Sequence, residues 1–188
     1  MRQRLVDLFS YMDETRERLV ATVSDINPMV AAVKPHGETW SVEENMAHLA
    51  KVEEGVARLV AKSVDWAKTN DVGRETSDES IMSSLDRYAL TTAAPKLKAP
   101  AMVAPEADKP LAESLAALAS SRSRLKDSLT AGDGLDLCGV KRAHPVLGEI
   151  DMYQWTLFVA QHEERHRIQI ERTLNDVTER AAECAPIV

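Results

Sequence analysis

The sequence predicts an all-α fold, a four-helix bundle with long crossover connections between its helices. Three observations support this fold class. Four stretches place apolar residues at helical spacing, capping signals mark the start of two of them, and no segment shows a convincing strand-like alternation. With 188 residues the chain can bury one substantial core, so we expect a single domain over residues 1–188.

The first two helices are expected at residues 4–24 and 41–66. In the first, apolar side chains recur on one helical face until a proline ends the pattern. The second has a capping box at its start: the hydroxyl of Ser41 can accept a hydrogen bond from the amide of Glu44, whose carboxylate can reach back to the amide of Ser41. The residues between these helices contain prolines and a glycine and are expected to be a linker.

Two further helices are expected at residues 110–132 and 151–177. The last one begins with a second capping signal, in which Asp151 and Gln154 take the reciprocal positions. Residues 69–110 contain polar residues followed by a run rich in proline and alanine, which predicts a long crossover with one short helix inside it. The glycine-rich stretch before the last helix is expected to be a loop.

Composition and charge limit the classes of function. The net charge of −7 and the absence of a basic stripe argue against a nucleic-acid partner. No apolar stretch is long enough to span a membrane, and acidic residues stand near the N-terminus where a signal peptide would be apolar. Cys138 and Cys184 form no metal or redox motif, which favours a reducing, cytoplasmic location.

The histidines are the most informative residues of the chain. His162 and His166, in the stretch HEERH, stand one turn apart on a face that also carries Trp155 and Phe158, so this face is expected to point inward. His48 lies among apolar residues of the second long helix and can face the interior too. Three imidazoles from two helices would form a metal site with an open coordination position.

HEERH also fits the zinc-protease pattern H-E-x-x-H, but its context does not. The metzincin extension would require a glycine at position 169 and a histidine at position 172, where this chain has Gln169 and Arg172. No strand is expected before the helix to bind a peptide substrate. We therefore do not expect a metalloprotease.

Each of these residues also has a purely structural interpretation. His48 could be a hydrogen-bonded core residue, and an H-x-x-x-H pair can arise by chance on a charged helix. Glu44 could serve only as a helix cap, and Glu163 and Glu164 could belong to a solvated face. The sequence alone leaves these alternatives open.

Two segments together resemble the DinB-like superfamily. The first is Trp40 to Leu49, and the second is His144 to Gly148 followed by Trp155 to Gln169. Relatives in this superfamily include the bacillithiol and mycothiol transferases and the mycothiol-dependent maleylpyruvate isomerases. The resemblance covers most of the chain, but residues 69–110 match no member of known activity.

The resemblance implies a four-helix bundle that holds a divalent metal ion, often zinc or nickel. Its ligands would be one histidine of the second helix and the histidine pair of the last. By position in this sequence these are His48, His162 and His166. They are the same three residues that the helical spacing brings together.

Three functions agree with such a site. The first is a metal-dependent enzyme that activates a low-molecular-weight thiol cofactor for S-transfer to a small-molecule substrate. The second is a hydrolase that uses a metal-bound hydroxide, with Glu44 or Glu163 as the carboxylate that moves protons. The third is a non-catalytic metal-binding or stress-related module. The sequence leaves the oligomeric state open, and a homodimer is one of the states it allows.

Overall fold

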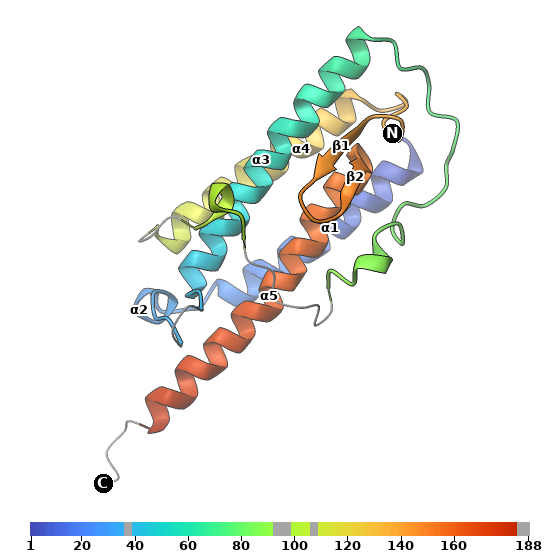
Figure 1. Ribbon diagram of the computed structural model, residues 1–188. Helices are drawn as coiled ribbons and strands as arrows, with labels where there is room; N and C mark the ends of the chain where they lie inside the picture. Colours follow the sequence, from blue (N-terminus) through green and yellow to red (C-terminus); the bar gives the residue numbers. More distant parts are fainter. Residues whose placement is uncertain (36–38, 92–98, 106–108, 184–188) are drawn as a thin grey trace.

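Four long helices dominate the fold, as the sequence predicts. The computed structural model describes residues 1–35, 39–91, 99–105 and 109–183, and Figure 1 shows the arrangement. The long helices are α1 (Gln3–Val23), α3 (Val42–Thr69), α4 (Leu111–Ala131) and α5 (Met152–Glu183). A single turn, α2 (Pro28–Ala31), lies in the stretch expected to be a linker. The all-α prediction is confirmed.

Helices α3 and α4 pack side by side and run in the same direction. Glu54 of α3 forms an ion pair with Arg124 of α4, and further along both helices Val64 and Ala131 line one hollow. Two parallel neighbours cannot be joined by a short loop, because the chain must return the length of the bundle before the second helix begins. The crossover at residues 70–110 follows from this arrangement (Figure 1).

Helices α1 and α5 form the second parallel pair. Arg4 lies over the ring of Tyr153 near the start of both helices, and Arg16 pairs with Glu163 further along. The two pairs pack against each other through α3 and α5 and run in opposite directions. The C-terminal turns of α5 extend past the other helices in Figure 1.

Both predicted capping boxes are present. The Ser41 hydroxyl accepts from the amide of Glu44 at 3.1 Å, and the Glu44 carboxylate accepts from the amide of Ser41 at 3.0 Å. Asp151 and Gln154 repeat the pattern at 2.9 and 3.1 Å. Each pair gives hydrogen-bond acceptors to amides that a helix start leaves without partners. These caps fix where the helices that carry the three candidate ligands begin.

A short β-hairpin replaces part of the loop expected before the last helix. Strand β1 (Lys141–His144) pairs antiparallel with β2 (Gly148–Asp151), and His144 lies opposite Gly148. Each strand has only four residues, too few to show the alternation of apolar and polar residues by which strands are recognised in a sequence. The expectation of a plain loop was therefore wrong here.

In its described residues the crossover contains two short 3-10 helices, η1 (Asp86–Tyr88) and η2 (Ala101–Val103), where one small helix was expected. Ile81 and Leu85 bury their side chains in the core just before η1. In the described part of the chain, no helix is both long and apolar enough to cross a membrane.

Candidate metal centre

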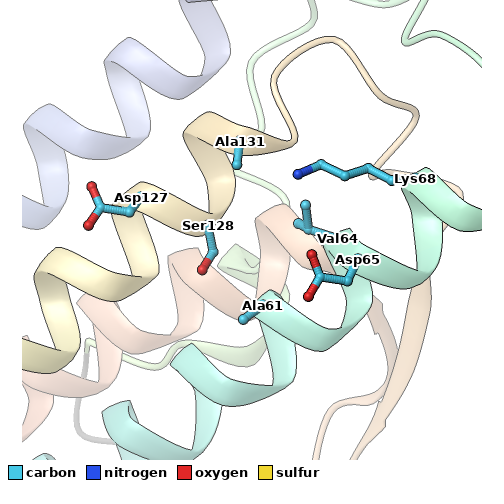
Figure 2. Close-up of a pocket in the computed structure, with 7 residues that line it drawn as sticks. All are labelled: Ala61, Val64, Asp65, Lys68, Asp127, Ser128 and Ala131. Carbon is cyan, nitrogen blue, oxygen red and sulfur yellow. The ribbon is translucent and has the colours of Figure 1, made fainter.

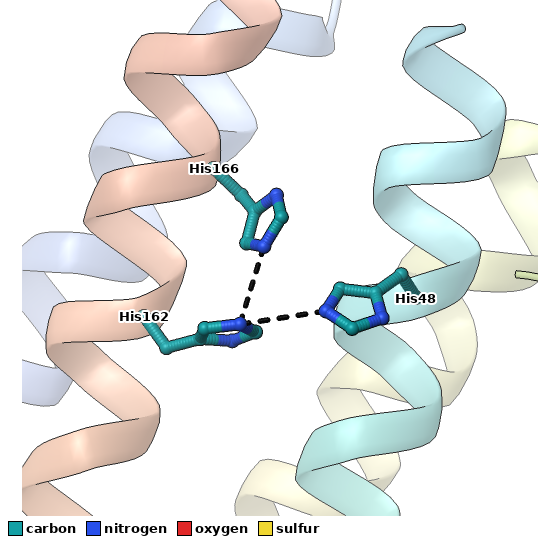
Figure 3. Close-up of side chains that lie close together, drawn as sticks. All are labelled: His48, His162 and His166. Carbon is teal, nitrogen blue, oxygen red and sulfur yellow. Dashed lines mark hydrogen bonds between the residues drawn. The ribbon is translucent and has the colours of Figure 1, made fainter. Parts of the chain in front are cut away.

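Three imidazole rings meet between α3 and α5, as Figure 3 shows. The Nε2 atom of His162 lies 3.4 Å from Nε2 of His48 and 3.2 Å from Nε2 of His166. One nitrogen of each ring lies within 4.8 Å of the others. His48 and His166 are buried, whereas His162 is partly exposed. The structure thus brings together the three histidines predicted as metal ligands.

The remaining ring nitrogens of His48 and His166 are held by acceptors that cannot donate. His48 Nδ1 lies 2.7 Å from the carbonyl oxygen of Val103, and His166 Nδ1 lies 2.9 Å from Oδ1 of Asn45. The Asn45 amide group donates to the carbonyl of Ser41 at 2.9 Å, which fixes which end of its side chain is the acceptor. Both Nδ1 atoms therefore carry the proton, and both Nε2 lone pairs point toward the centre.

Two of the three nitrogen separations match those around a tetrahedral metal ion, and all three nitrogens lie within 4.8 Å of one another. Zinc binds imidazole nitrogen at about 2.0–2.1 Å, so two ligands at a tetrahedral angle lie about 3.3–3.4 Å apart. The Nε2 separations of 3.4 and 3.2 Å agree with this value. Without a cation, the Nε2 lone pairs of His48 and His166 would both face Nε2 of His162. A neutral His162 has only one N–H proton, so it could donate a hydrogen bond to only one of them. The donor set therefore fits a divalent ion such as zinc or nickel.

Burial keeps these rings neutral. It lowers the pKa of His166 to about 3, with a smaller contribution from His48, and it lowers the pKa of His162 well below its ordinary value. Burial also lowers the pKa of His48, although the hydrogen bond to Val103 acts in the opposite direction. A neutral imidazole has a free lone pair, so each ring is ready to bind a cation near neutral pH.

Aromatic rings surround the triad. Trp40 lies 4.8 Å from the ring of His48, and Phe158 stacks on His162 at 5.1 Å between ring centroids. His144, at the end of β1, packs 4.5 Å from Phe158. Stacking on Phe158 restricts the orientation of the His162 ring.

His144 itself has a fixed tautomer. Its Nδ1 accepts from the amides of Val146 and Leu147, both at 3.1 Å, and burial lowers its pKa to about 4. The proton of the neutral ring is therefore on Nε2. The sequence indicated no role for this residue, yet only the ring of Phe158 separates it from His162 of the triad.

The two carboxylates predicted to move protons are engaged elsewhere. Glu44 caps α3 and pairs with Lys34 at 2.6 Å. Glu163 is 1% exposed, and its Oε2 accepts from Arg16 at 2.6 and 2.9 Å and from Arg122 at 3.0 Å. The alternative that Glu163 belongs to a solvated face was wrong, and its catalytic role stays a prediction.

Glu163 belongs to a layer of charge with one residue from each long helix: Arg16, Glu53, Arg122 and Glu163. All of them are buried except Arg16, which is partly exposed. Arg16 and Arg122 both contact both carboxylates. The layer divides the apolar core into two clusters, one toward the hairpin and one toward α2. The four charges sum to zero, so the layer needs no external counter-ion. We name these four residues the charge layer.

Cys138 and Arg167 contact residues outside the triad. Cys138 is half-buried beside Arg4 and Glu75, and burial raises the pKa of its thiol, which makes it a weak nucleophile near neutral pH. His36 and Cys184 lie outside the residues that the structure describes. Arg167 pairs with Glu164 and Glu171, so its side chain is occupied by neighbouring glutamates.

A hollow between the C-terminal halves of α3 and α4 is a separate feature. Figure 2 shows its lining, which includes Asp65, Lys68 and Asp127 but neither histidine nor cysteine. Its nearest α3 residue, Ala61, is about 20 Å along the helix from His48 at 1.5 Å per residue. The hollow is therefore not part of the candidate metal centre.

Comparison with known families agrees with this geometry. A model of the DinB superfamily matches residues 11–170, a range that includes all three histidines. The chain belongs to the DinB superfamily. A search of curated proteins finds no match to the sequence. For a DinB-superfamily chain, a cluster of histidines that could hold a metal ion between α3 and α5 agrees with the metal site expected from the resemblance.

The hydrogen bonds that orient the candidate ligands His48 and His166 at Nδ1 were not predicted from the sequence. Asn45 orients His166 from one turn before His48, and Val103 orients His48 from within the crossover. For Asn45 a signal existed, because it stands three residues before His48 on the helix that carries this ligand. For Val103 none existed, because a backbone carbonyl leaves no trace in the residue type.

Proposed function

We propose that this DinB-superfamily protein is a metal-dependent enzyme that activates a low-molecular-weight thiol for S-transfer, in which the thiol becomes attached through its sulfur to a small electrophilic substrate. The observation that carries the proposal is the convergence of three neutral imidazoles, two of them with the Nε2 lone pair fixed inward by a hydrogen bond at Nδ1. Zinc or nickel suits this donor set.

The three ligands are all neutral, and this decides what the site can supply. A divalent cation held there would keep its full charge and would lower the pKa of a coordinating thiol, which provides a thiolate nucleophile near neutral pH. His48 and His166 are buried, whereas His162 reaches the surface, so a small molecule would enter on the side of His162. Phe158 and Trp40 would exclude water from the flanks.

The placement of the carboxylates favours thiol transfer over hydrolysis. Hydrolysis of an ester or amide requires a group that delivers a proton to the leaving atom. Glu44 and Glu163, the two residues expected to do this, hold a helix cap and the charge layer. In thiol transfer the sulfur gives its electron pair to an electrophilic carbon, the bond to the leaving group breaks with its electrons, and the thiol proton passes to solvent.

The first experiment measures metal content. The purified parent should contain about one divalent ion per chain, and the His48→Ala variant should lose most of it, because two ligands remain. The matched control is His144→Ala, which removes a histidine outside the triad and should keep its metal. Absence of metal from the parent after incubation with zinc or nickel would contradict the proposal.

The second experiment separates the reaction classes. The metal-loaded protein is incubated with an electrophile such as a chlorodinitrobenzene, with and without a panel of small thiols that includes glutathione and cysteine. Consumption above the uncatalysed rate that requires both thiol and metal supports S-transfer. Consumption of an ester substrate without thiol would instead support a hydrolase. Metal binding with neither activity would support the non-catalytic module.

A further inference from the structure

The two ends of the crossover are fastened to the bundle in different ways. Near its start, buried Glu75 pairs with Arg4 and accepts a hydrogen bond from the hydroxyl of Tyr153 at 2.7 Å. Further along, the hydroxyl of Tyr88 donates to the carbonyl of Leu147 at 2.7 Å. None of these contacts involves a residue of the triad. This part of the crossover is therefore held whether or not a metal ion is bound.

The far end is held by a metal-ligand candidate. The segment Ala99–Pro105 contains η2, and its Val103 carbonyl accepts from Nδ1 of His48 at 2.7 Å. The neighbouring carbonyl of Ala104 accepts from the amine of Lys51 at 3.3 Å. Both donors come from consecutive turns of α3. We name residues 99–105 the clasp.

The hydrogen bond to Val103 depends on the state of His48. A neutral imidazole has one proton and can carry it on either nitrogen. If the proton moves to Nε2, the Nδ1 lone pair faces the Val103 oxygen, and the bond that holds the clasp is lost. A cation on Nε2 removes that tautomer, because the nitrogen that binds it cannot carry a proton, and it also makes the Nδ1 proton a stronger donor.

We propose that metal binding fastens the clasp onto α3, so that the end of the crossover beside the site is docked in the metal-loaded protein and undocks when the metal is removed. This inference rests on the proposed metal site. By linkage, docking must strengthen metal binding by the same factor by which metal binding strengthens docking. Outer contacts of this kind change metal affinity by about 10- to 100-fold.

The turn of η2 offers two amides that report on docking. The amide of Val103 donates to Pro100 at 3.0 Å, and the amide of Ala104 donates to Ala101 at 3.2 Å. A reference comes from the part of the crossover held without the triad, where the amide of Tyr88 donates to Leu85 at 2.9 Å. A metal effect confined to the clasp would separate docking from a general change in stability.

The experiment is hydrogen–deuterium exchange of the full chain, read by mass spectrometry, with the protein loaded with Zn²⁺ or stripped by a chelator. Zinc content is measured on the same samples. We expect exchange in residues 99–105 to slow by about 10-fold or more with zinc, and exchange in residues 81–89 to change much less. If no zinc binds, the proposed function fails. If zinc binds and the clasp exchanges at the same rate, the inference is overturned.

A variant tests the reciprocal effect. Ala104→Pro removes the amide bond to Ala101 and disfavours the helical conformation at Val103, so the Val103 carbonyl should turn away from His48. We expect zinc affinity to fall by about 10- to 100-fold, measured by competition with a chromophoric chelator. Met102→Ala is the control, because that side chain is 76% exposed on the same turn. Equal zinc affinity in Ala104→Pro and the parent would overturn the inference, provided that residues 81–89 exchange as in the parent.

Discussion

The Glu163→Gln substitution tests whether Glu163 is a structural residue or a catalytic one. The side chain is 1% exposed, and one of its oxygens accepts from both Arg16 and Arg122. Although burial alone would lower the pKa of Arg122, the carboxylates of Glu163 and Glu53 raise it. Glutamine keeps the shape but removes the charge, so the two guanidinium groups would share Glu53 alone and leave one positive charge uncompensated inside the bundle.

The magnitude follows from this burial. Removal of one partner of a buried ion pair costs about 3–5 kcal/mol, because the remaining charge stays desolvated. For a chain of this length each kcal/mol lowers Tm by roughly 2–4 °C, so Tm should fall by about 6–20 °C. Denaturant unfolding with circular dichroism measures the free energy directly. The control is Glu164→Gln on the same helix, whose partly exposed ion pairs with Arg18 and Arg167 should be worth about 1 kcal/mol or less.

A double variant makes the test specific to charge. Arg16→Gln added to Glu163→Gln leaves Arg122 and Glu53 as a neutral pair, so the double variant should be more stable than the sum of the single effects by about 1 kcal/mol or more. Strictly additive effects would refute the account of the charge layer. So would a Glu163→Gln protein that keeps its stability and its metal but loses all activity, since that outcome would make Glu163 a catalytic residue.

Three further predictions concern the centre and its surroundings. Asn45→Ala should weaken zinc binding by about 10- to 100-fold in chelator competition, because His166 loses the acceptor at Nδ1, whereas exposed Asn175→Ala should not. The metal-free protein should be less stable at pH 5 than at pH 7. The pKa of His166 is near 6.5 in the unfolded chain and about 3 in the folded chain, so at pH values between these only the unfolded chain binds the proton. The free energy of unfolding, measured by denaturant titration, should therefore depend less on pH in His166→Gln. Cys138 should react slowly with iodoacetamide at pH 7 in the folded protein and quickly in urea, as peptide-resolved mass spectrometry would show, because burial raises its pKa. Fast modification of the folded chain would contradict this last assignment.

The helices and the ligand set were predictable because their signals are local. The capping box at Ser41 marks the start of α3, and helical spacing places His48 on its apolar face. A separation of four residues places His162 and His166 on one face of α5. The family resemblance adds that the two faces meet. The hairpin was not predicted because its four-residue strands are too short to show the alternation of apolar and polar residues that identifies a strand.

The contacts that tune the centre were not predictable from sequence patterns. Glu163 stands in a charged stretch that resembles a solvated face, and its partners Arg16 and Arg122 are 147 and 41 residues away in the chain. Only the packing of four helices shows that these charges meet away from water. Val103 contributes a carbonyl group, which every residue has, from a crossover whose course no local pattern specifies.

The charge layer lies next to the metal centre along α3 and α5, so it can fix the register of these two helices as well as affect stability. Glu53 follows His48 on α3 by five residues, and Glu163 directly follows His162 on α5; Arg122 binds both carboxylates. A buried ion network is a poor source of net stability, but it penalises every arrangement in which its charges lose their partners. Sliding α5 by one turn, about 5.4 Å, would separate Glu163 from Arg122 and also destroy Nε2 separations of 3.2 to 3.4 Å. We therefore expect the charge layer to hold α3 and α5 in the one register in which three imidazoles can bind a single ion.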